Sequence, residues 1–218
     1  MSTQSANAAP ADPTRAIALA MTGASGAQYG LRLLEMLVRA RRPVYVMISR
    51  AGQIVMGSET DFALPARTAE MERRLTEQFQ AAPGQIRVFG QDEWTAPVAS
   101  GSAAAAAMVV CPCSMATVAA LAAGTSRTLI ERAGDVMLKE RRPLIVVPRE
   151  TPLSVIHLEN LLRLARAGAT VLPANPGFYH RPARIEELID FLVARILDHL
   201  GIEQRLMKRW GEPEPGED

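Results

Sequence analysis

The sequence has little of what marks several common classes of protein. Its 218 residues include 24 lysines and arginines against 23 acidic residues, so the net charge is only +1. A near-neutral chain gives no reason to expect a nucleic-acid partner or a charged membrane surface as a partner. No apolar run approaches transmembrane length, and the first residues lack the basic-then-apolar layout of a signal peptide. We therefore expect a cytoplasmic protein.

Cysteine, histidine and paired acidic residues are equally sparse. The two cysteines, Cys111 and Cys113, flank a proline and have no histidine nearby, which is too few ligands for a zinc site. The three histidines are scattered, and no Asp-rich motif for holding a magnesium diphosphate appears. We expect the cysteines to be small buried residues in a reducing compartment, and we expect no bound metal.

What the sequence does contain is a distinctive stretch near its start. An apolar run over residues 18–21 breaks at Gly23 and continues with helical spacing after Gly26, which predicts a buried strand, a tight turn and an amphipathic helix. The glycines let the backbone approach a ligand, and Ser25 lies beside the free N–H groups of the new helix. The glycine spacing is not that of the dinucleotide fingerprint. A nucleotide or flavin site and a plain strand–helix turn both remain open.

The rest of the chain alternates between apolar runs and helical patterns. We expect further strands at 43–48, 86–89, 106–110, 144–147 and 170–173, with helices at 50–55, 67–79, 116–123, 129–140, 154–167 and 185–200. This order predicts one doubly wound α/β domain of three layers with a mostly parallel sheet. We place that domain at residues 15–203, between a flexible N-terminal tail (1–14) and a C-terminal tail (204–218).

In such a domain ligands bind beyond the carboxyl ends of the strands, where the strand order reverses. Hydroxyl residues open the helices that follow three strands, at Ser25, at Ser49, and at Ser114 with Thr117. Hydroxyls at helix N-termini suit a phosphate and the polar edge of a flavin ring. Helix capping explains Ser49 and Ser114 equally well, so both interpretations stay open.

Charged residues follow the later strands. Arg149 and Glu150 come directly after an apolar strand, Tyr179 follows another, and Arg195 lies in the last helix. Arginine and lysine match phosphate chemistry, although a lone Arg195 is equally consistent with a surface side chain. Lys139 precedes its strand and so lies at the opposite end of the sheet. It is either a solvated helix end or a contributor to a site across a subunit contact.

Several runs of residues 15–210 match one family together. They cover residues 22–27, 29–34, 111–115, 132–133, 135–136, 138–144, 149–153, 156–158 and 178–182. The most specific is Leu-Lys-Glu-Arg-Arg-Pro-Leu at 138–144, followed by Arg-Glu-Thr-Pro-Leu at 149–153. These runs closely resemble those of the UbiX-type flavin prenyltransferases. The resemblance implies a flavodoxin-like, Rossmann-like fold and a homododecamer. It also implies transfer of a dimethylallyl group from dimethylallyl phosphate to N5 and C6 of reduced FMN. The product serves UbiD-type decarboxylases, as in ubiquinone biosynthesis.

The resemblance also assigns roles to residues, with no metal among the ligands. It implies FMN contacts at Gly23, Ala24, Ser25, Ser49, Ser114, Met115, Ala116, Thr117 and Arg149. It implies prenyl-phosphate contacts at Tyr179, Arg195 and Lys139, with Lys139 donated by a neighbouring subunit. Glu150 matches the family's proton-handling carboxylate, Ser25 its partner near N5, and Trp210 an aromatic residue near the prenyl pocket. Fixed cations at the leaving phosphate would do what Mg²⁺ does in diphosphate-using prenyltransferases.

Two other functions compete with this hypothesis. An FMN-dependent cysteine decarboxylase of related fold should carry a catalytic histidine after the first helix region, and none is found there. A non-catalytic flavin carrier would need fewer cations than Lys139, Arg149 and Arg195 provide, because FMN has one phosphate. For Glu150, the alternative to proton transfer is an ion pair that orients Arg149.

Overall fold

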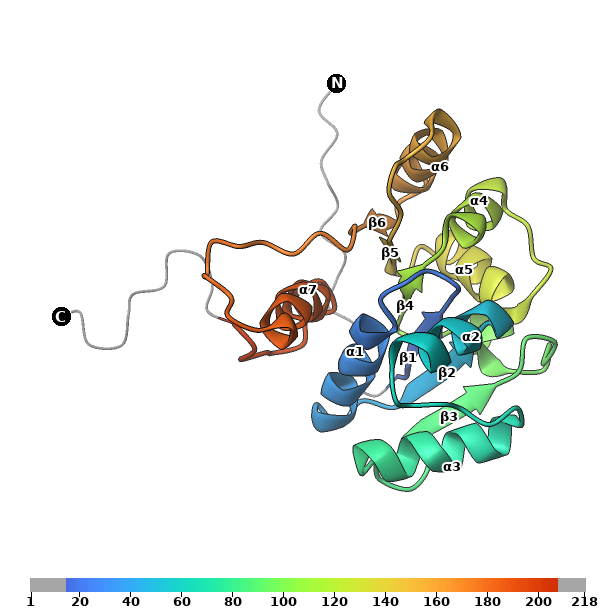
Figure 1. Ribbon diagram of the computed structural model, residues 1–218. Helices are drawn as coiled ribbons and strands as arrows, with labels where there is room; N and C mark the ends of the chain where they lie inside the picture. The colour runs from blue at the N-terminus through green and yellow to red at the C-terminus, as the bar shows by residue number, and fades with distance from the viewer. Residues whose placement is uncertain (1–14, 208–218) are drawn as a thin grey trace.

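A computed structural model describes residues 15–207, and the chain in that range folds around a single six-stranded sheet (Figure 1). The strands lie in the order β3-β2-β1-β4-β5-β6, and every neighbouring pair is parallel. This is the strand order of doubly wound Rossmann-type sheets. The strands are β1 (Ile17–Met21), β2 (Val44–Ile48), β3 (Ile86–Phe89), β4 (Ala107–Cys113), β5 (Leu144–Pro148) and β6 (Thr170–Val171).

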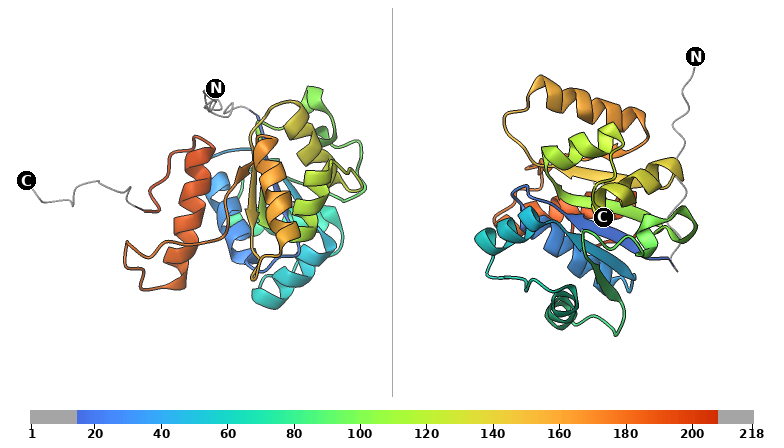
Figure 2. Two further views of the ribbon diagram at one scale, coloured as in Figure 1. Left: turned by 90° about the horizontal axis from the view of Figure 1, so that it is seen from above. Right: turned by 90° about the vertical axis from the view of Figure 1, so that its right-hand side faces the viewer.

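Helices cover both faces of the sheet, which gives the three layers seen in Figure 2. One face carries α1 (Ala27–Arg39), α2 (Arg50–Glu59), α3 (Thr68–Phe79) and α7 (Ile185–His199). The other carries α4 (Met115–Ala123), α5 (Leu129–Lys139) and α6 (Val155–Arg166). Strand β1 is buried on both sides: Ile17, Leu19 and Met21 belong to one core, whereas Ala18 and Ala20 belong to the other. Burial on both faces explains why this strand reads as a continuous apolar run.

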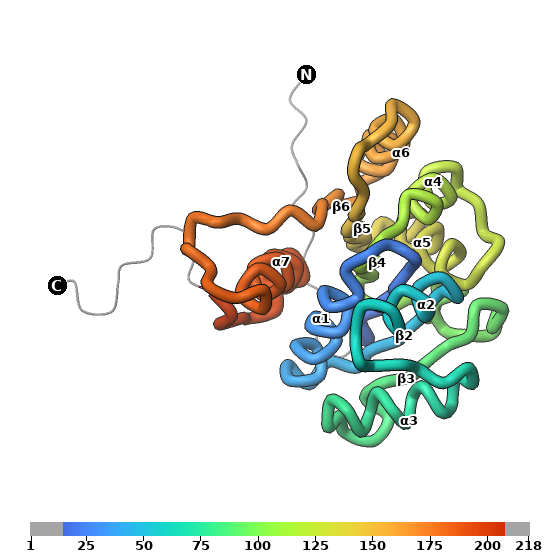
Figure 3. The backbone as a smooth tube through the Cα atoms, in the orientation of Figure 1, coloured from blue at the N-terminus to red at the C-terminus, as the bar shows by residue number. Residues whose placement is uncertain are grey.

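The chain reverses direction across the sheet once, as the tube in Figure 3 shows. From β1 it winds outward through β2 to β3, then crosses back to place β4 on the other side of β1. The crossing segment contains two short 3₁₀ turns, Pro97–Ala99 and Gly101–Ala103, in a stretch where the sequence predicted neither a helix nor a strand. The switch point between β1 and β4 is where a ligand site is expected in this architecture.

The predicted three-layer α/β fold is confirmed, with small differences at element ends. Strand β4 continues to Cys113 instead of ending at Val110, because Cys111 and Cys113 are both completely buried and extend the apolar strand. Both thiols are free, as expected, and burial raises the pKa of each. Within residues 15–207, no helix is both long enough and apolar enough to cross a bilayer.

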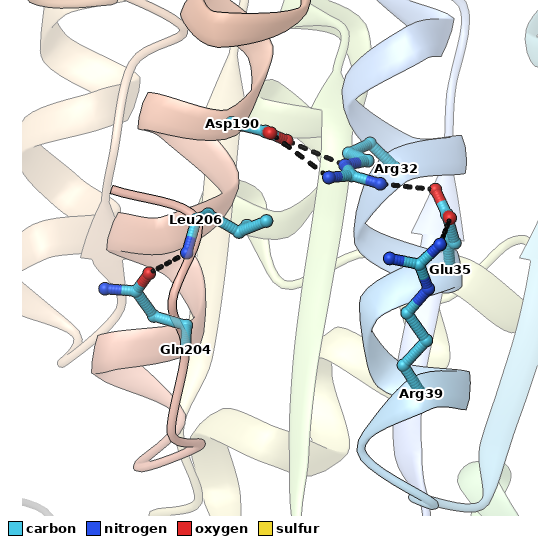
Figure 4. A network of polar contacts seen from close by, with 6 residues as sticks. All are labelled: Arg32, Glu35, Arg39, Asp190, Gln204 and Leu206. Atoms are coloured by element: carbon cyan, nitrogen blue, oxygen red, sulfur yellow. Dashed lines mark hydrogen bonds and ion pairs between the residues drawn. The ribbon is translucent and has the colours of Figure 1, made fainter. Parts of the chain in front are cut away.

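A half-buried network of ion pairs connects helix α7 to helix α1 (Figure 4). The Arg32 guanidinium donates to both Asp190 oxygens, at 2.7 and 3.1 Å, and to Glu35 at 2.7 Å. The hydrogen bond to Asp190 is the main reason why the pKa of Arg32 is raised. A bidentate arginine–carboxylate pair fixes geometry as well as adding stability. This network therefore fixes α7 against α1, in addition to the buried apolar side chains of α7.

We expect Asp190→Ala to lower the free energy of unfolding by about 1–3 kcal/mol, because it removes two charge-assisted hydrogen bonds from a partly buried arginine. Glu77→Ala is the control, since it breaks the exposed Arg73–Glu77 pair of α3 and should cost less than about 0.5 kcal/mol. Urea denaturation measures both. Equal losses in the two variants would show that the Arg32 network contributes no more than a surface pair.

A candidate site at the carboxyl edge of the sheet

The candidate site is organised by Thr22, the residue that follows β1. Its side chain is 2% exposed. The hydroxyl donates to the carbonyl oxygen of Pro112 at 3.1 Å and accepts from the amide of Ser114 at 2.8 Å. These bonds join the end of β1 to the end of β4. The turn before α1 and the N-terminus of α4 are thereby held together at the switch point.

The turn from Gly23 to Gly26 needs both of its glycines. A Cβ atom on Gly23 would lie 2.5 Å from the Cβ of Ala51, so the turn packs directly against the first turn of α2. Gly26 has a φ of 107° where it caps α1, a left-handed conformation that other residues rarely adopt. The predicted tight turn is therefore present, and α2 lies directly beside it.

The N-terminus of α1, where the sequence predicted an anion, is occupied by a carboxylate of the chain itself. Glu59, the last residue of α2, accepts from the amides of Gly26 and Ala27 at 2.8 and 3.0 Å. Sequence reasoning missed Glu59 because it lies 32 to 33 residues from these partners in a polar stretch. Only the general preference of helix N-termini for acidic groups pointed to such a residue.

Glu59 also contacts the predicted site residue Ser25. Burial alone would raise the pKa of Glu59. The Ser25 hydroxyl, the two amides and the nearby positive charge of Arg149 outweigh burial, and the pKa lies below its ordinary value. The Nε atom of Arg149 donates to the carbonyl oxygen of Ser25 at 3.3 Å. The structure thus brings together Ser25, Arg149 and an ionised Glu59.

The hydroxyls after β2 and β4 act as helix caps. Ser49 accepts from the amide of Gly52 at 3.0 Å, and Ser114 accepts from the amide of Thr117 at 3.3 Å. The Met115 side chain is buried in the core, so only its backbone faces the site, and Ala116 is exposed. The first amides of a helix have no partner within the helix. Those of Met115 and Ala116 can therefore serve a ligand.

Arg149 and Glu150 do not pair with each other in the structure. The Glu150 carboxylate accepts from the amide of Thr151 at 3.1 Å, while Arg149 turns toward Ser25. Both residues line a groove of about 390 Å³ that extends under Leu161 of α6. A hollow of about 780 Å³ lies at the opposite edge of the sheet, next to Pro43 and Gln85, far from these groups. The groove beside Arg149 is therefore the one relevant to the candidate site.

Tyr179 and Arg195 form a second group on and beside α7. The Tyr179 ring meets Phe191 edge-on at 5.7 Å, and Phe191 lies one helical turn before Arg195. His180 stacks on Phe191 at 5.6 Å and was not predicted as a site residue. Arg195 donates to Asp198 at 3.3 Å. The aromatic contacts thus place Tyr179 and Arg195 on the same side of α7.

Two predicted residues lie apart from these groups. Lys139 ends α5 at the amino edge of the sheet, as expected, and forms an ion pair with Glu140. Trp210 lies outside the described residues. Within residues 15–207, no group of three or more His, Cys, Asp or Glu side chains could hold a metal ion.

We expect Glu59→Gln to lower the free energy of unfolding by about 1–2 kcal/mol at neutral pH, because an ionised acceptor stabilises a helix N-terminus better than an amide. Since the folded-state pKa lies below the ordinary 4.5, the difference from wild type should be full above that value. It should disappear as the pH falls through the folded-state pKa. Unfolding curves between pH 3 and 7 test this, with exposed Glu77→Gln as the baseline. A difference that does not change with pH would contradict an ionised Glu59.

Comparison with known proteins identifies the family of the chain. The family model described as Flavoprotein matches residues 5–197. Flavin prenyltransferase UbiX of Pseudomonas aeruginosa is 62% identical over 196 residues, which cover 90% of this chain and 94% of that protein. Flavin prenyltransferase UbiX of Halalkalibacterium halodurans is 47% identical, with 88% and 91% covered.

Solved structures show the same likeness. A structure of AnUbiX (PadA1) in complex with FMN and dimethylallyl pyrophosphate has a TM-score of 0.81 at 41% identity, covering 92% of this chain and 99% of that one. A dodecameric FMN-dependent Ubix-like decarboxylase from Escherichia coli O157:H7 has a TM-score of 0.80 at 35% identity, with 90% and 100% covered. On these similarities, the chain belongs to the UbiX family of flavin prenyltransferases.

Proposed function

We propose that this protein transfers a dimethylallyl group from dimethylallyl phosphate to reduced FMN, with new bonds at N5 and C6. The observation that carries the proposal is the group formed by Ser25, Glu59 and Arg149, together with the first-turn amides of Met115 and Ala116 in α4. The 62% identity to a flavin prenyltransferase supports the same activity. So does the relative solved with FMN and dimethylallyl pyrophosphate.

The residues present fit FMN in one orientation better than in another. Because Glu59 already neutralises the N-terminus of α1, a phosphate there would meet a like charge. The first turn of α4 has no such carboxylate and offers the amides of Met115 and Ala116 with the hydroxyls of Ser114 and Thr117. We propose that these groups would hold the FMN phosphate, and that Gly23, Ala24, Ser25, Ser49 and Arg149 would hold the rest of the flavin.

The bond between Ser25 and Glu59 determines what Ser25 can do. An ionised carboxylate only accepts, so Ser25 must give its hydrogen to Glu59. Its oxygen lone pairs can then accept a hydrogen bond from an N–H donor, such as N5 of reduced flavin. Glu59 can take up a proton that is relayed through Ser25. When bound, reduced flavin supplies nucleophilic N5 and C6 atoms and an electron-rich ring face.

The leaving phosphate needs cations, and we assign this task to Lys139, Arg149 and Arg195 with the Tyr179 hydroxyl. As the allylic C–O bond breaks, negative charge grows on the phosphate, and fixed positive charges lower that barrier without a metal. From the family resemblance, we also assign to Trp210 the role of shielding the allyl cation. Ring closure adds the proton released at N5 to the dimethylallyl double bond and removes the proton at C6. Glu150, which is exposed and makes no ion pair with Arg149, accepts the C6 proton.

This assignment requires more than one copy of the chain. Lys139 lies at the amino edge of the sheet, and Arg195 lies more than a turn beyond Asp190 toward that same edge. Both are therefore remote from Ser25 within one protomer and would reach the site of a neighbouring subunit. We propose a homododecamer, which is the state of the Escherichia coli relative. We further propose a cytoplasmic location and transfer of the product to a UbiD-type decarboxylase, as in ubiquinone biosynthesis.

The activity is tested by anaerobic incubation with reduced FMN and dimethylallyl phosphate in excess chelator. The flavin should gain the mass of one C₅H₈ unit, because Lys139, Arg149 and Arg195 supply the charge that a metal would otherwise supply. A parallel sample containing Mg²⁺ is the control. A product that forms only with added Mg²⁺ would contradict the role given to the cations. If unmodified flavin accompanies decarboxylation of a cysteine peptide, the competing enzyme class is correct.

The role of Glu150 is tested by Glu150→Gln, which keeps size and hydrogen bonding but cannot accept a proton. FMN binding should be unchanged while turnover falls by about 10²-fold or more. Fluorescence titration and product mass measure the two quantities, with exposed Glu77→Gln as the control. A loss of FMN binding in proportion to the loss of activity would show that Glu150 only orients Arg149.

A further inference from the structure

Helix α6 leaves most of its apolar side chains in solvent. Val155, Leu158 and Leu162 are 70, 52 and 50% exposed, whereas Leu164 is the one fully buried residue of this helix. Figures 1 and 2 show α6 at the end of the sheet that carries β5 and β6, with one side toward α4 and the other free. Scattered exposed leucines are ordinary on a protein surface. Those of α6 are not scattered.

The exposed residues of α6 follow the spacing of a helix–helix seam. Val155, Leu158, Leu162 and Ala165 are separated by three, four and three residues, the a–d–a–d pattern by which one helix packs against another. Leu164 points away from the seam into the core, and Leu161, at the g position beside the seam, packs partly against the core. The protomer thus uses one side of α6 for its own packing and exposes a complete seam on the other.

The charges beside the seam indicate what packs on it. Glu159 and Arg166 both occupy the e position of this pattern and are exposed. In an antiparallel pair of helices, e positions of the two chains lie on the same side of the seam. Two copies of α6 packed in that way would place Glu159 next to Arg166 of the other copy, twice. Such self-complementarity is what a two-fold contact requires.

We propose that α6 docks antiparallel on α6 of a second copy of this chain. The inference rests on the oligomer of the proposed function and specifies one of its contacts. The seam adjoins the groove at Arg149 and Glu150, since Leu153 and Leu161 line that groove. A two-fold contact alone gives a dimer, so a closed assembly of twelve chains also needs another contact. Phe178 and Ile185 are exposed apolar residues outside α6, and they can take part in such a second contact.

The first test removes the apolar seam. The double variant Leu158→Ser/Leu162→Ser should keep the protomer fold, because neither side chain is part of the core, and the assembly mass should fall at least about twofold. Ile156→Ser is the matched control. Ile156 is 67% exposed on the same helix, but it points about 100° away from Val155 and outside the seam. Sedimentation measures mass, and circular dichroism confirms the fold. A wild-type mass for the double variant, or an equal loss for Ile156→Ser, overturns the proposal.

The second test reverses the charges. Glu159→Arg should lower the assembly mass by placing like charges together, and Glu159→Arg/Arg166→Glu should restore it. Failure of the double change to restore the mass, or no effect of Glu159→Arg, overturns the antiparallel arrangement. Both tests measure mass, whereas the proposed function is measured by prenylated flavin. A wild-type protein that assembles through α6 but forms no prenylated flavin would contradict only the function.

Discussion

The buried hydroxyl of Thr22 is the contact on which the candidate site depends. Donation to Pro112 and acceptance from Ser114 use both capacities of one side chain, and they fix the ends of two central strands relative to each other. Every predicted FMN contact except Ser49 and Arg149 lies in the segments that leave these two strands. Even these two follow strands β2 and β5, which neighbour β1 and β4. A change at Thr22 would therefore move the turn before α1 and the cap of α4 together.

Glu59 changes the electrostatics that a strand–turn–helix motif normally implies. A free helix N-terminus attracts a phosphate, but here two amides and a serine hydroxyl are already satisfied by a carboxylate. The phosphate of a bound flavin is thereby directed to α4, and Ser25 is left with a defined hydrogen direction. In this proposal, Glu59 thus directs phosphate binding to the N-terminus of α4 and leaves proton transfer to Ser25 at the N-terminus of α1.

The fold was predictable because β1, β2, β4 and β5 are buried on both faces and read as uninterrupted apolar runs. The turn after β1 was also predictable from local sequence, because the apolar run breaks at Gly23 and helical spacing begins after Gly26. Glu59 was not, because its contact with Gly26 joins residues 33 apart through the position of α2, which no local pattern encodes. The end of β4 was placed three residues too early, at Val110, although the buried cysteines at 111 and 113 extend the strand.

The cations assigned to the prenyl phosphate are already paired in the single chain, Lys139 with Glu140 and Arg195 with Asp198. Exposed pairs of this kind contribute about 0–1 kcal/mol, so giving them up at a subunit contact costs little. Until a phosphate arrives, these neighbours also limit the repulsion between cations that assembly would bring together. In the proposed assembly, the cationic half of the site therefore forms only where two chains meet. That arrangement keeps Lys139 and Arg195 away from Glu59 of their own chain, so that they do not form ion pairs with this carboxylate in place of the phosphate.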